Sequence, residues 1–308
     1  MKGLRQWFPC PPDYGRVEKY KDVLAGLTVA LLLIPQAMAY ALLAGVPPVY
    51  GVYASLVPML IYALLSTTPH VSVGPTALAS ILSLSALSTL ATPGTDEYLQ
   101  LILLLAGLTG LVQLAFGFLR LGVLVSFLSR PVISGFVSAA AVLIAFSQVK
   151  TLFGISVART SYLHDSIREL WQNAITYHLP TTLVGVGSIL LLLLGKRFAP
   201  KLPATLILII MATLASGWFK LDRLGLEVVG SVPSGFPQFG FPTFSDHQLF
   251  SLIPAALIIA LISFVETLSV GKTYAEKHTY YRIHPNRELI ALGAAKFLGA
   301  FFQAIPTS

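Results

Sequence analysis

Nine long apolar runs, separated by short polar connections, dominate the hydrophobic pattern of the chain. They lie at about residues 23–45, 50–65, 74–90, 99–119, 124–149, 179–194, 202–219, 250–270 and 289–305. A helix that crosses a bilayer needs about 20 mostly apolar residues, so each run can form a span or most of one. The pattern therefore predicts an all-α integral membrane protein with nine crossings.

Composition agrees with this prediction. Hydrophobic residues make up 55% of the chain and charged residues only 11%, whereas a soluble domain carries about 25% charged residues. The net charge of +7 does not indicate a nucleic-acid partner, because the Lys and Arg residues lie mostly in the connections between runs. A chain of this composition is expected to have the lipid bilayer as its surroundings.

The basic residues also predict the orientation. Most of them lie at the N-terminus and in the connections that follow runs two, four, six and eight, and few lie in the other connections. Cytoplasmic connections of membrane proteins are enriched in Lys and Arg. We therefore expect a multi-pass protein of the inner (plasma) membrane with a cytoplasmic N-terminus and an external Ser308.

Two of the runs carry residues that disturb a helix. Run one contains Pro35 near its middle, where proline removes a backbone hydrogen bond and kinks or breaks the helix. Run three begins Gly74-Pro75-Thr76 and is short, so it is expected to start deep in the membrane, with Pro75 at the first helical position. Discontinuous helices of this kind form the midplane substrate sites of many secondary transporters. A plain kink and a plain loop are the alternatives.

Glu266 is the acidic residue that lies inside an apolar run, the eighth. An ionisable group within a membrane is costly and usually marks a functional site. A buried carboxyl that is neutral with an anion bound and charged in the empty site would couple anion uptake to protons. Glu266 is therefore the candidate coupling residue, and an interfacial position at the end of the run is the alternative.

Polar side chains in runs one and three are candidates for substrate binding. Gln36 and Tyr40 share a helix face if the helix continues there, and Thr76 and Ser80 have the same spacing at the start of run three. Free amides of a helix N-terminus, together with hydroxyl groups, can hold an anion without a fixed positive charge. Alternatively, Gln36 satisfies the backbone that Pro35 frees, and the hydroxyl groups bond to their own helix.

Other residues give weaker indications. Ser269, three positions after Glu266, is a further candidate, and Lys296 lies near the middle of run nine, where it can pair with Glu266, attract an anion or snorkel. We favour pairing or a polar interior. Cys10 is the single cysteine, and no metal-ligand spacing, phosphate-binding loop or catalytic triad occurs. We therefore expect no cofactor, no metal and no enzymatic activity.

Several motifs in order resemble the sulfate permease family (SulP). They are Ala25–Ala30 followed by Ile34–Ala41, then Pro48–Tyr53, Ser72–Pro75, Val229–Gly235 and Phe264–Thr267. The resemblance implies fourteen segments in two inverted repeats of seven, with the third and tenth segments as half-helices whose N-termini face each other around an anion. It also implies a cytoplasmic STAS domain after the membrane domain, and a homodimer for the full-length protein.

The resemblance assigns roles to individual residues. Gln36, Tyr40, Gly74, Pro75 and Thr76 match positions that line the anion pocket, and Glu266 matches an acid linked to cation coupling in symporting members. Lys296 departs from the family pattern, which has a neutral residue there, often Asn.

The resemblance also divides the chain. We expect a cytoplasmic N-terminus at 1–21, the first seven-segment repeat at 22–220, an external Pro/Gly-rich linker at 221–248 and two segments of the second repeat at 249–308. The chain stops where the tenth segment is expected to begin, so it is expected to be the N-terminal membrane portion, truncated before that segment and without the STAS domain. Residues 1–308 alone are then expected to show no saturable sulfate uptake.

The sequence therefore predicts secondary active transport of an inorganic anion, with sulfate as the expected substrate and protons, or alternatively sodium, as the coupling ion. Bicarbonate or another anion, transported by symport or exchange, is an alternative within the family. Outside the family, a nucleobase permease of similar architecture or a non-transporting fragment would also fit the pattern.

Overall fold

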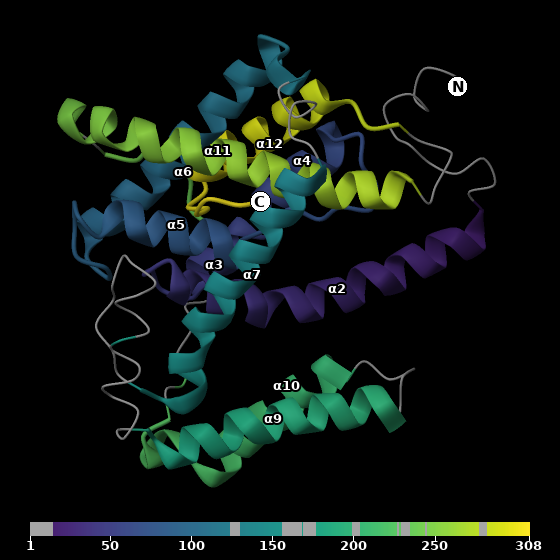
Figure 1. The fold of residues 1–308 in the computed structure, drawn as a ribbon, viewed down its shortest axis with the longest axis vertical. Coiled ribbons are helices and arrows are strands. Elements are labelled where there is room, and N and C mark those ends of the chain that lie inside the picture. Colours follow the sequence, from purple (N-terminus) through teal and green to yellow (C-terminus); the bar gives the residue numbers. More distant parts are fainter. Residues whose placement is uncertain are drawn as a thin grey trace. The chain divides into compact units, whose positions relative to one another are not determined.

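The computed structural model describes residues 15–123, 130–155, 168, 177–198, 204–226, 228, 235–243, 245–276 and 282–308. Every regular element in these residues is a helix (Figure 1), which agrees with the predicted fold class. The chain forms two compact units, one of residues 1–134 and 232–308 and the other of residues 135–231. The predicted division of the chain at 220 and 248 stays a prediction.

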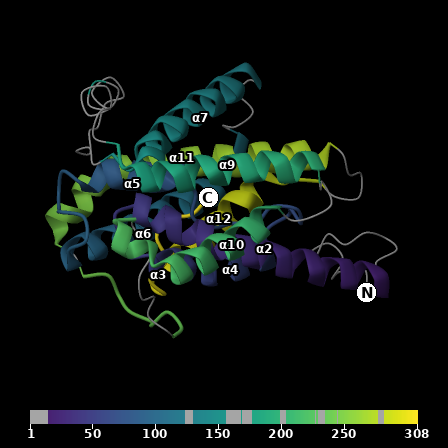
Figure 2. The same ribbon diagram turned by 90° about the horizontal axis from the view of Figure 1, so that it is seen from below.

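The first membrane helix is continuous. Helix α2 runs from Arg16 to Leu43 with Pro35 inside it, so the helix does not break at this proline, and the alternative of a plain kink stays a prediction. The N-terminal part of α2 is exposed and reaches beyond the end of α11 (Asp246–Ala275) (Figure 1, Figure 2). Because the helix persists, side chains four positions apart lie on the same face of it.

The second run is divided into two short helices, α3 (Val49–Ala54) and α4 (Val57–Leu65). Helix α3 packs closely against α2, since a Cβ at Gly51 would lie only 2.0 Å from the carbonyl oxygen of Ala37. Only glycine permits this approach of the two backbones.

Helix α5 (Ala77–Leu87) has 11 residues, which is about 16 Å of helix and roughly half the thickness of a bilayer core. The short third segment is thus as predicted. Its start differs in detail, because Thr76 is the N-cap and its side chain accepts a hydrogen bond from the amide of Ala79. Pro75 therefore precedes the helix and does not occupy its first turn.

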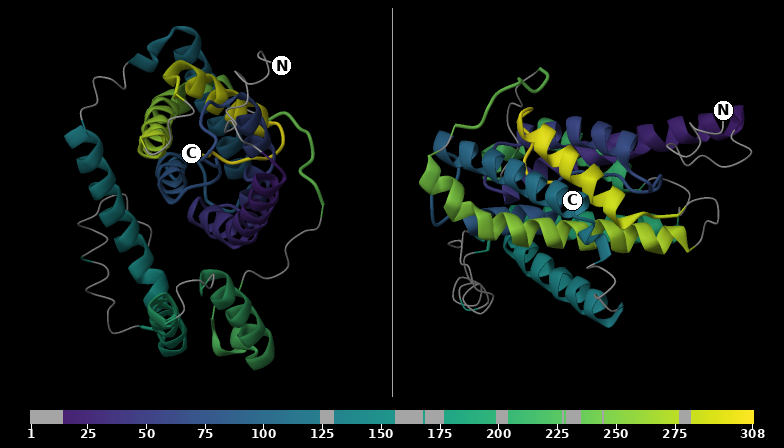
Figure 3. Two further views of the ribbon diagram at one scale, coloured as in Figure 1. Left: turned by 90° about the vertical axis from the view of Figure 1, so that its right-hand side faces the viewer. Right: turned by 90° about the horizontal axis from the view of Figure 1, so that it is seen from above.

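Three helices form the core of the first unit: α6 (Asp96–Phe118), α11 and α12 (Pro285–Ala300). Helix α12 packs most extensively against α6 and also against α4. Glycines allow this contact, because a Cβ at Gly110 would lie 2.4 Å from the amide nitrogen of Phe297, and one at Gly293 would lie 2.6 Å from that of Leu114. The residues after α12 end among the helices of this unit (Figure 3).

Part of the predicted linker packs against the end of α12. The amide of Gly240 donates a hydrogen bond of 2.8 Å to the carbonyl of Phe301, and the rings of Phe239 and Phe241 contact the ring of Phe301. The motif at Val229–Gly235 lies outside the described residues except for Gly235.

The second unit contains residues 135–153 of α7 (Arg130–Phe153), together with α9 (Leu179–Phe198), α10 (Ala204–Phe219) and the short helix η3 (Leu221–Leu224). Its helices α9 and α10 expose many large apolar side chains, and α9 buries no residue. An apolar surface of this extent is typical of helices that face lipid.

Four helices in the described residues are long and apolar enough to cross a membrane: Arg16–Leu43, Asp96–Phe118, Leu179–Phe198 and His247–Ala275. Three apolar helical segments, at Val49–Leu65, Ala77–Leu87 and Ile207–Phe219, are shorter. These segments agree with seven of the nine predicted runs, and the number of crossings and their direction stay predictions.

Candidate functional site

Two non-helical segments meet at the N-terminal side of α5. The amide of Gly74 donates to the carbonyl oxygen of Ser308 at 3.2 Å, and the amide of Ser308 donates to the carbonyl oxygen of Gly74 at 2.9 Å. Both residues are buried. Backbone groups inside a membrane need partners within the protein unless they line a cavity, so this exchange stabilises two irregular segments at one place.

The start of α5 carries hydroxyl groups of two kinds. Thr76 caps the helix through its bond to Ala79. In contrast, the buried hydroxyl oxygens of Ser80, one turn later, and of Thr307, beside the bridging Ser308, have no hydrogen-bond partner. Buried polar atoms are nearly always paired, so these two hydroxyls indicate a place where a ligand can supply the missing partner.

Glu266 lies on α11 and reaches the same place. It is partly buried, nine residues before the end of a 30-residue helix, so it does not occupy the end of its segment. The hydroxyl of Ser308 donates a hydrogen bond of 2.5 Å to its Oε2 atom. The carboxyl group is therefore hydrogen-bonded directly to the residue that bridges to Gly74. Ser269 behaves differently, since its hydroxyl donates to the carbonyl of Val265 in its own helix.

Gln36 and Tyr40 lie on one face of α2, as predicted for a continuous helix. The side-chain amide of Gln36 donates to the hydroxyl oxygen of Tyr40 at 2.9 Å. Their helix passes beside the bridge, because a Cβ at Gly74 would lie 3.6 Å from the side chain of Leu33, one turn before Gln36. Pro75 is buried next to Gly74. The predicted pocket residues of the first and third segments thus come from neighbouring elements.

The structure places Lys296 in a polar interior, which is one of the two favoured interpretations. Its ammonium nitrogen donates to Gln113 Oε1 at 3.0 Å and to Ser263 Oγ at 2.5 Å. Lys296 is 1% exposed, so it does not snorkel either. The polar partners on α6 and α11 can be recognised only after the three helices are packed together.

Glu288 is a second buried acid that the apolar runs did not reveal. Its carboxylate accepts hydrogen bonds from the hydroxyl of Tyr62 at 2.7 Å, from the amide of Thr67 at 2.6 Å and from the hydroxyls of Thr67 and Thr68. It was missed because α12 begins at Pro285, four residues before the run at 289. Pro285, a typical first helical residue, is the signal that would have placed Glu288 within the helix.

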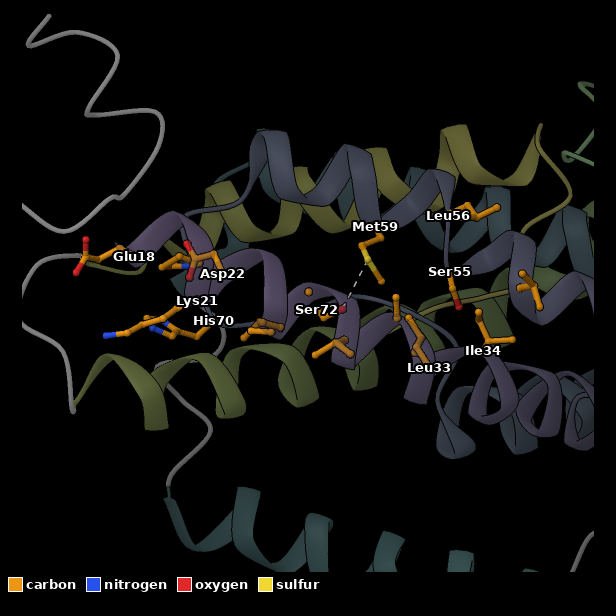
Figure 4. A pocket seen from close by; sticks show the side chains of 17 residues that line it. Glu18, Lys21, Asp22, Leu33, Ile34, Ser55, Leu56, Met59, His70 and Ser72 are labelled. Atoms are coloured by element: carbon orange, nitrogen blue, oxygen red, sulfur yellow. Dashed lines mark hydrogen bonds between the residues drawn. The ribbon is translucent and has the colours of Figure 1, made fainter. Parts of the chain in front are cut away.

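A groove runs along the exposed side of α2 (Figure 4). It has a volume of about 910 Å³ and is lined by α2, the α3–α4 break and residues 69–72. Charged side chains, including Glu18 and Lys21, lie at one end, and Ile34 and Ser55 lie toward the other (Figure 4). A Cβ at Gly74 would lie 3.7 Å from the Ser55 hydroxyl, so the groove extends from the N-terminal end of α2 to the neighbourhood of the bridge.

No cluster of three or more His, Cys, Asp or Glu side chains that could hold a metal ion occurs within the residues that the structure describes. The donors at the bridge are hydroxyls and amides, which bind anions.

Comparison with known proteins gives a consistent result. The profile of the sulfate permease family matches residues 20–308. The chain is 36% identical over 313 residues to sulfate transporter 4.1, chloroplastic, of Arabidopsis thaliana, covering 98% of this chain and 45% of that protein. It is also 36% identical to a probable sulfate transporter of Mycobacterium tuberculosis, covering 96% of this chain and 52% of the relative.

A solved structure of the murine solute carrier 26 family member A9, an anion transporter in its inward-facing state, superimposes with a TM-score of 0.84 at 28% identity. The alignment covers 99% of this chain and 53% of the other. The chain thus spans about half the length of the curated relatives it matches. The profile match over nearly the whole chain, the identity to two sulfate transporters and the shared all-helical fold together show that this chain belongs to the sulfate permease family.

Proposed function

We propose that the protein is a secondary active transporter of inorganic anions in the inner membrane, with sulfate as substrate and protons as the coupling ion. The observation that carries this proposal is the bridge between Gly74 and Ser308 at the start of α5, with a carboxyl group and two unpartnered hydroxyls around it. The names of the relatives, which include sulfate transporters of a plant and a bacterium, support sulfate as the substrate.

The start of α5 attracts anions for two physical reasons. The first amides of a helix have no intrahelical acceptor, and the helix dipole adds about half a unit of positive charge at this end. Thr76 occupies one of the free amides, that of Ala79, which leaves other amides of the first turn for a ligand. The hydroxyls of Ser80 and Thr307 add donors without a fixed charge, so an anion can be bound and also released.

Glu266 supplies the proposed coupling. An ionised carboxylate repels an anion nearby: at a separation of about 6 Å and an effective dielectric constant of about 20, the repulsion of a divalent anion is about 5 kcal/mol. Protonation of Glu266 removes this repulsion, so proton binding and sulfate binding favour each other. The groove along α2 is the proposed path from the cytoplasmic side, which the predicted orientation assigns to the N-terminus.

The test is uptake of radiolabelled sulfate into proteoliposomes. Residues 1–308 and a form extended through a complete second repeat are compared, with uracil and bicarbonate as competitors. We expect no saturable uptake by residues 1–308 alone, and saturable uptake by the extended form that rises as the external pH falls. Glu266→Gln should remove the pH dependence, because the titrating proton is gone, whereas Ser269→Ala should leave it unchanged, since that hydroxyl bonds its own helix.

Three results would contradict the proposal in different ways. If neither form takes up sulfate, the transport function is wrong. Uptake that uracil abolishes and sulfate does not would favour a nucleobase permease, and preferential competition by bicarbonate would change the substrate. A Glu266→Gln variant that still responds to pH would leave transport in place and refute coupling through this carboxyl.

A further inference from the structure

Lys296 places an ammonium group in the interior of the three-helix core. Its side chain is 1% exposed and lies on α12, and its two hydrogen-bond partners, Gln113 and Ser263, come from α6 and α11. A buried amine without an acceptor would be costly. The packing of three separate helices around this one nitrogen indicates that the site is built to hold it.

The hydrogen-bond directions in this cluster favour the charged form of the amine. The side-chain nitrogen of Gln113 donates to the carbonyl of Ala260 at 2.8 Å and to Ser263 Oγ at 2.9 Å, so the oxygen of Gln113 faces Lys296. The hydroxyl of Ser263 donates to the carbonyl of Ala260 and presents its lone pairs to Lys296. Both partners therefore accept a hydrogen bond from Lys296, and neither directs a hydrogen atom toward its nitrogen. An ammonium ion, which can only donate hydrogen bonds, requires such surroundings.

Glu266 is the acidic residue near the hydrogen-bond partner that Lys296 has on α11. It lies three residues after Ser263 on α11, which is about 4.5 Å along the helix axis. The other charged groups on the packed helices are farther away or already engaged. Glu288 precedes Lys296 on α12 by about 12 Å along the helix axis. Its carboxylate already accepts hydrogen bonds from Tyr62, Thr67 and Thr68.

The remaining ionisable groups lie toward the helix ends. Asp96, Glu97 and Tyr98 lie in the first turn of α6, about 22 Å of helix from Gln113, and Lys272 is about 13 Å beyond Ser263 on α11. On α4 the ionisable residue is Tyr62, which bonds to Glu288. Glu266 is therefore the acid that belongs to this cluster, because it lies one helical turn after Ser263, the residue to which Lys296 donates.

We propose that Lys296 is a fixed internal cation that sets the charge class of the transported anion, favouring divalent over monovalent anions. The inference rests on the anion-transport function proposed above and adds a selectivity residue that is not part of the anion pocket itself. Lys296 donates to Ser263, Glu266 follows one helical turn later on α11, and Ser308 donates to Glu266 and bridges to Gly74. The electric field of the Lys296 ammonium therefore acts on an anion at the bridge, although its hydrogen bonds are made to side chains of α6 and α11 and not to the anion.

The physical consequence is a difference between anions of different charge. The attraction between a fixed cation and an anion is proportional to the charge of the anion. At a separation of about 10 Å and an effective dielectric constant of about 20, a unit positive charge tightens binding about 15-fold for a monovalent anion and about 200-fold for a divalent one. A purely structural role for Lys296 would weaken both kinds of anion equally.

The experiment measures the apparent KM for sulfate and the inhibition constants of chloride, nitrate and bicarbonate in the same proteoliposome assay. Lys296 is replaced by Gln and, separately, by Met, so that one variant remains if the other does not fold. Both are combined with Glu266→Gln. Lys272→Gln, which removes an exposed positive charge from the end of α11, is the matched control.

We expect the KM for sulfate to rise about 200-fold in Lys296→Gln or Lys296→Met, while the inhibition constants of monovalent anions rise about 15-fold. Adding Glu266→Gln should restore most of the affinity for sulfate, because it removes the negative charge that Lys296 compensates. Lys272→Gln should change neither constant.

Equal losses for sulfate and monovalent anions, or a double variant no better than the single one, would refute the role of Lys296 and leave the transport function standing. Unchanged constants in a folded Lys296 variant would refute it as well. Absence of sulfate uptake by the unsubstituted extended form would instead overturn the function on which the inference rests.

Discussion

Replacing Glu288 by alanine tests whether the buried carboxylate joins the end of the second segment to the ninth. The carboxylate accepts four hydrogen bonds, from Tyr62, from both the amide and the hydroxyl of Thr67, and from Thr68. It also lies in the first turn of α12, where the helix dipole favours a negative charge. The substitution removes all of these interactions at once.

The expected loss follows from what the donors can do afterwards. The three hydroxyl groups can rotate toward other acceptors, whereas the buried amide of Thr67 cannot, and an unsatisfied buried donor costs about 1–3 kcal/mol. The lost bonds to a charged acceptor add to this, and relief from burying the charge subtracts from it. We expect a net destabilisation of about 3 kcal/mol, against about 1 kcal/mol for Tyr62→Phe, which removes a single donor.

The assay is thermal unfolding in detergent, followed by loss of the monodisperse peak on size exclusion. For a domain of about 200 residues, 1 kcal/mol corresponds to about 2–4 °C, so Glu288→Ala should lower the midpoint by about 6–12 °C. Glu18→Gln removes an exposed carboxylate that caps α2 and should have a far smaller effect. A Glu288→Ala variant as stable as Tyr62→Phe would refute the reasoning.

Other consequences of the structure are open to direct measurement. Gly293→Ala should destabilise the protein by more than about 3 kcal/mol in the same assay, on the order expected for overpacking, because the new Cβ would meet the backbone of α6 at 2.6 Å. Gly107→Ala is the control and should be tolerated, because its new Cβ would meet only a methyl group at 3.5 Å. Cysteines placed at Asp96 and Lys196 in an otherwise cysteine-free protein should be labelled from opposite sides of intact cells, and labelling of both from one side would contradict the predicted topology. Ser80→Ala should raise the KM for sulfate about tenfold without changing the unfolding midpoint, as expected for the loss of one hydrogen bond to a charged ligand; an unchanged KM would remove this hydroxyl from the anion site.

The sequence by itself determined the class of protein and the family. Each apolar run carries its own hydrophobicity, so helices such as α6 and α11 can be predicted without knowledge of their neighbours. The short third segment was also predictable, since Gly74, Pro75 and Thr76 restrict the backbone locally. Pro35 did not decide between a break and a kink, because helices in a membrane can continue through a proline when neighbouring groups satisfy the freed backbone.

Only the tertiary structure decided which polar groups meet. Lys296 and Gln113 are separated by 183 positions and Glu288 and Tyr62 by 226, and nothing in the local pattern around any of them identifies the partner. The contact between Gly74 and Ser308 is of the same kind. A hydrophobic run specifies that a segment is buried. The partners of its few polar side chains depend instead on which helix faces pack together. In this chain, close glycine contacts between α6 and α12 determine those faces.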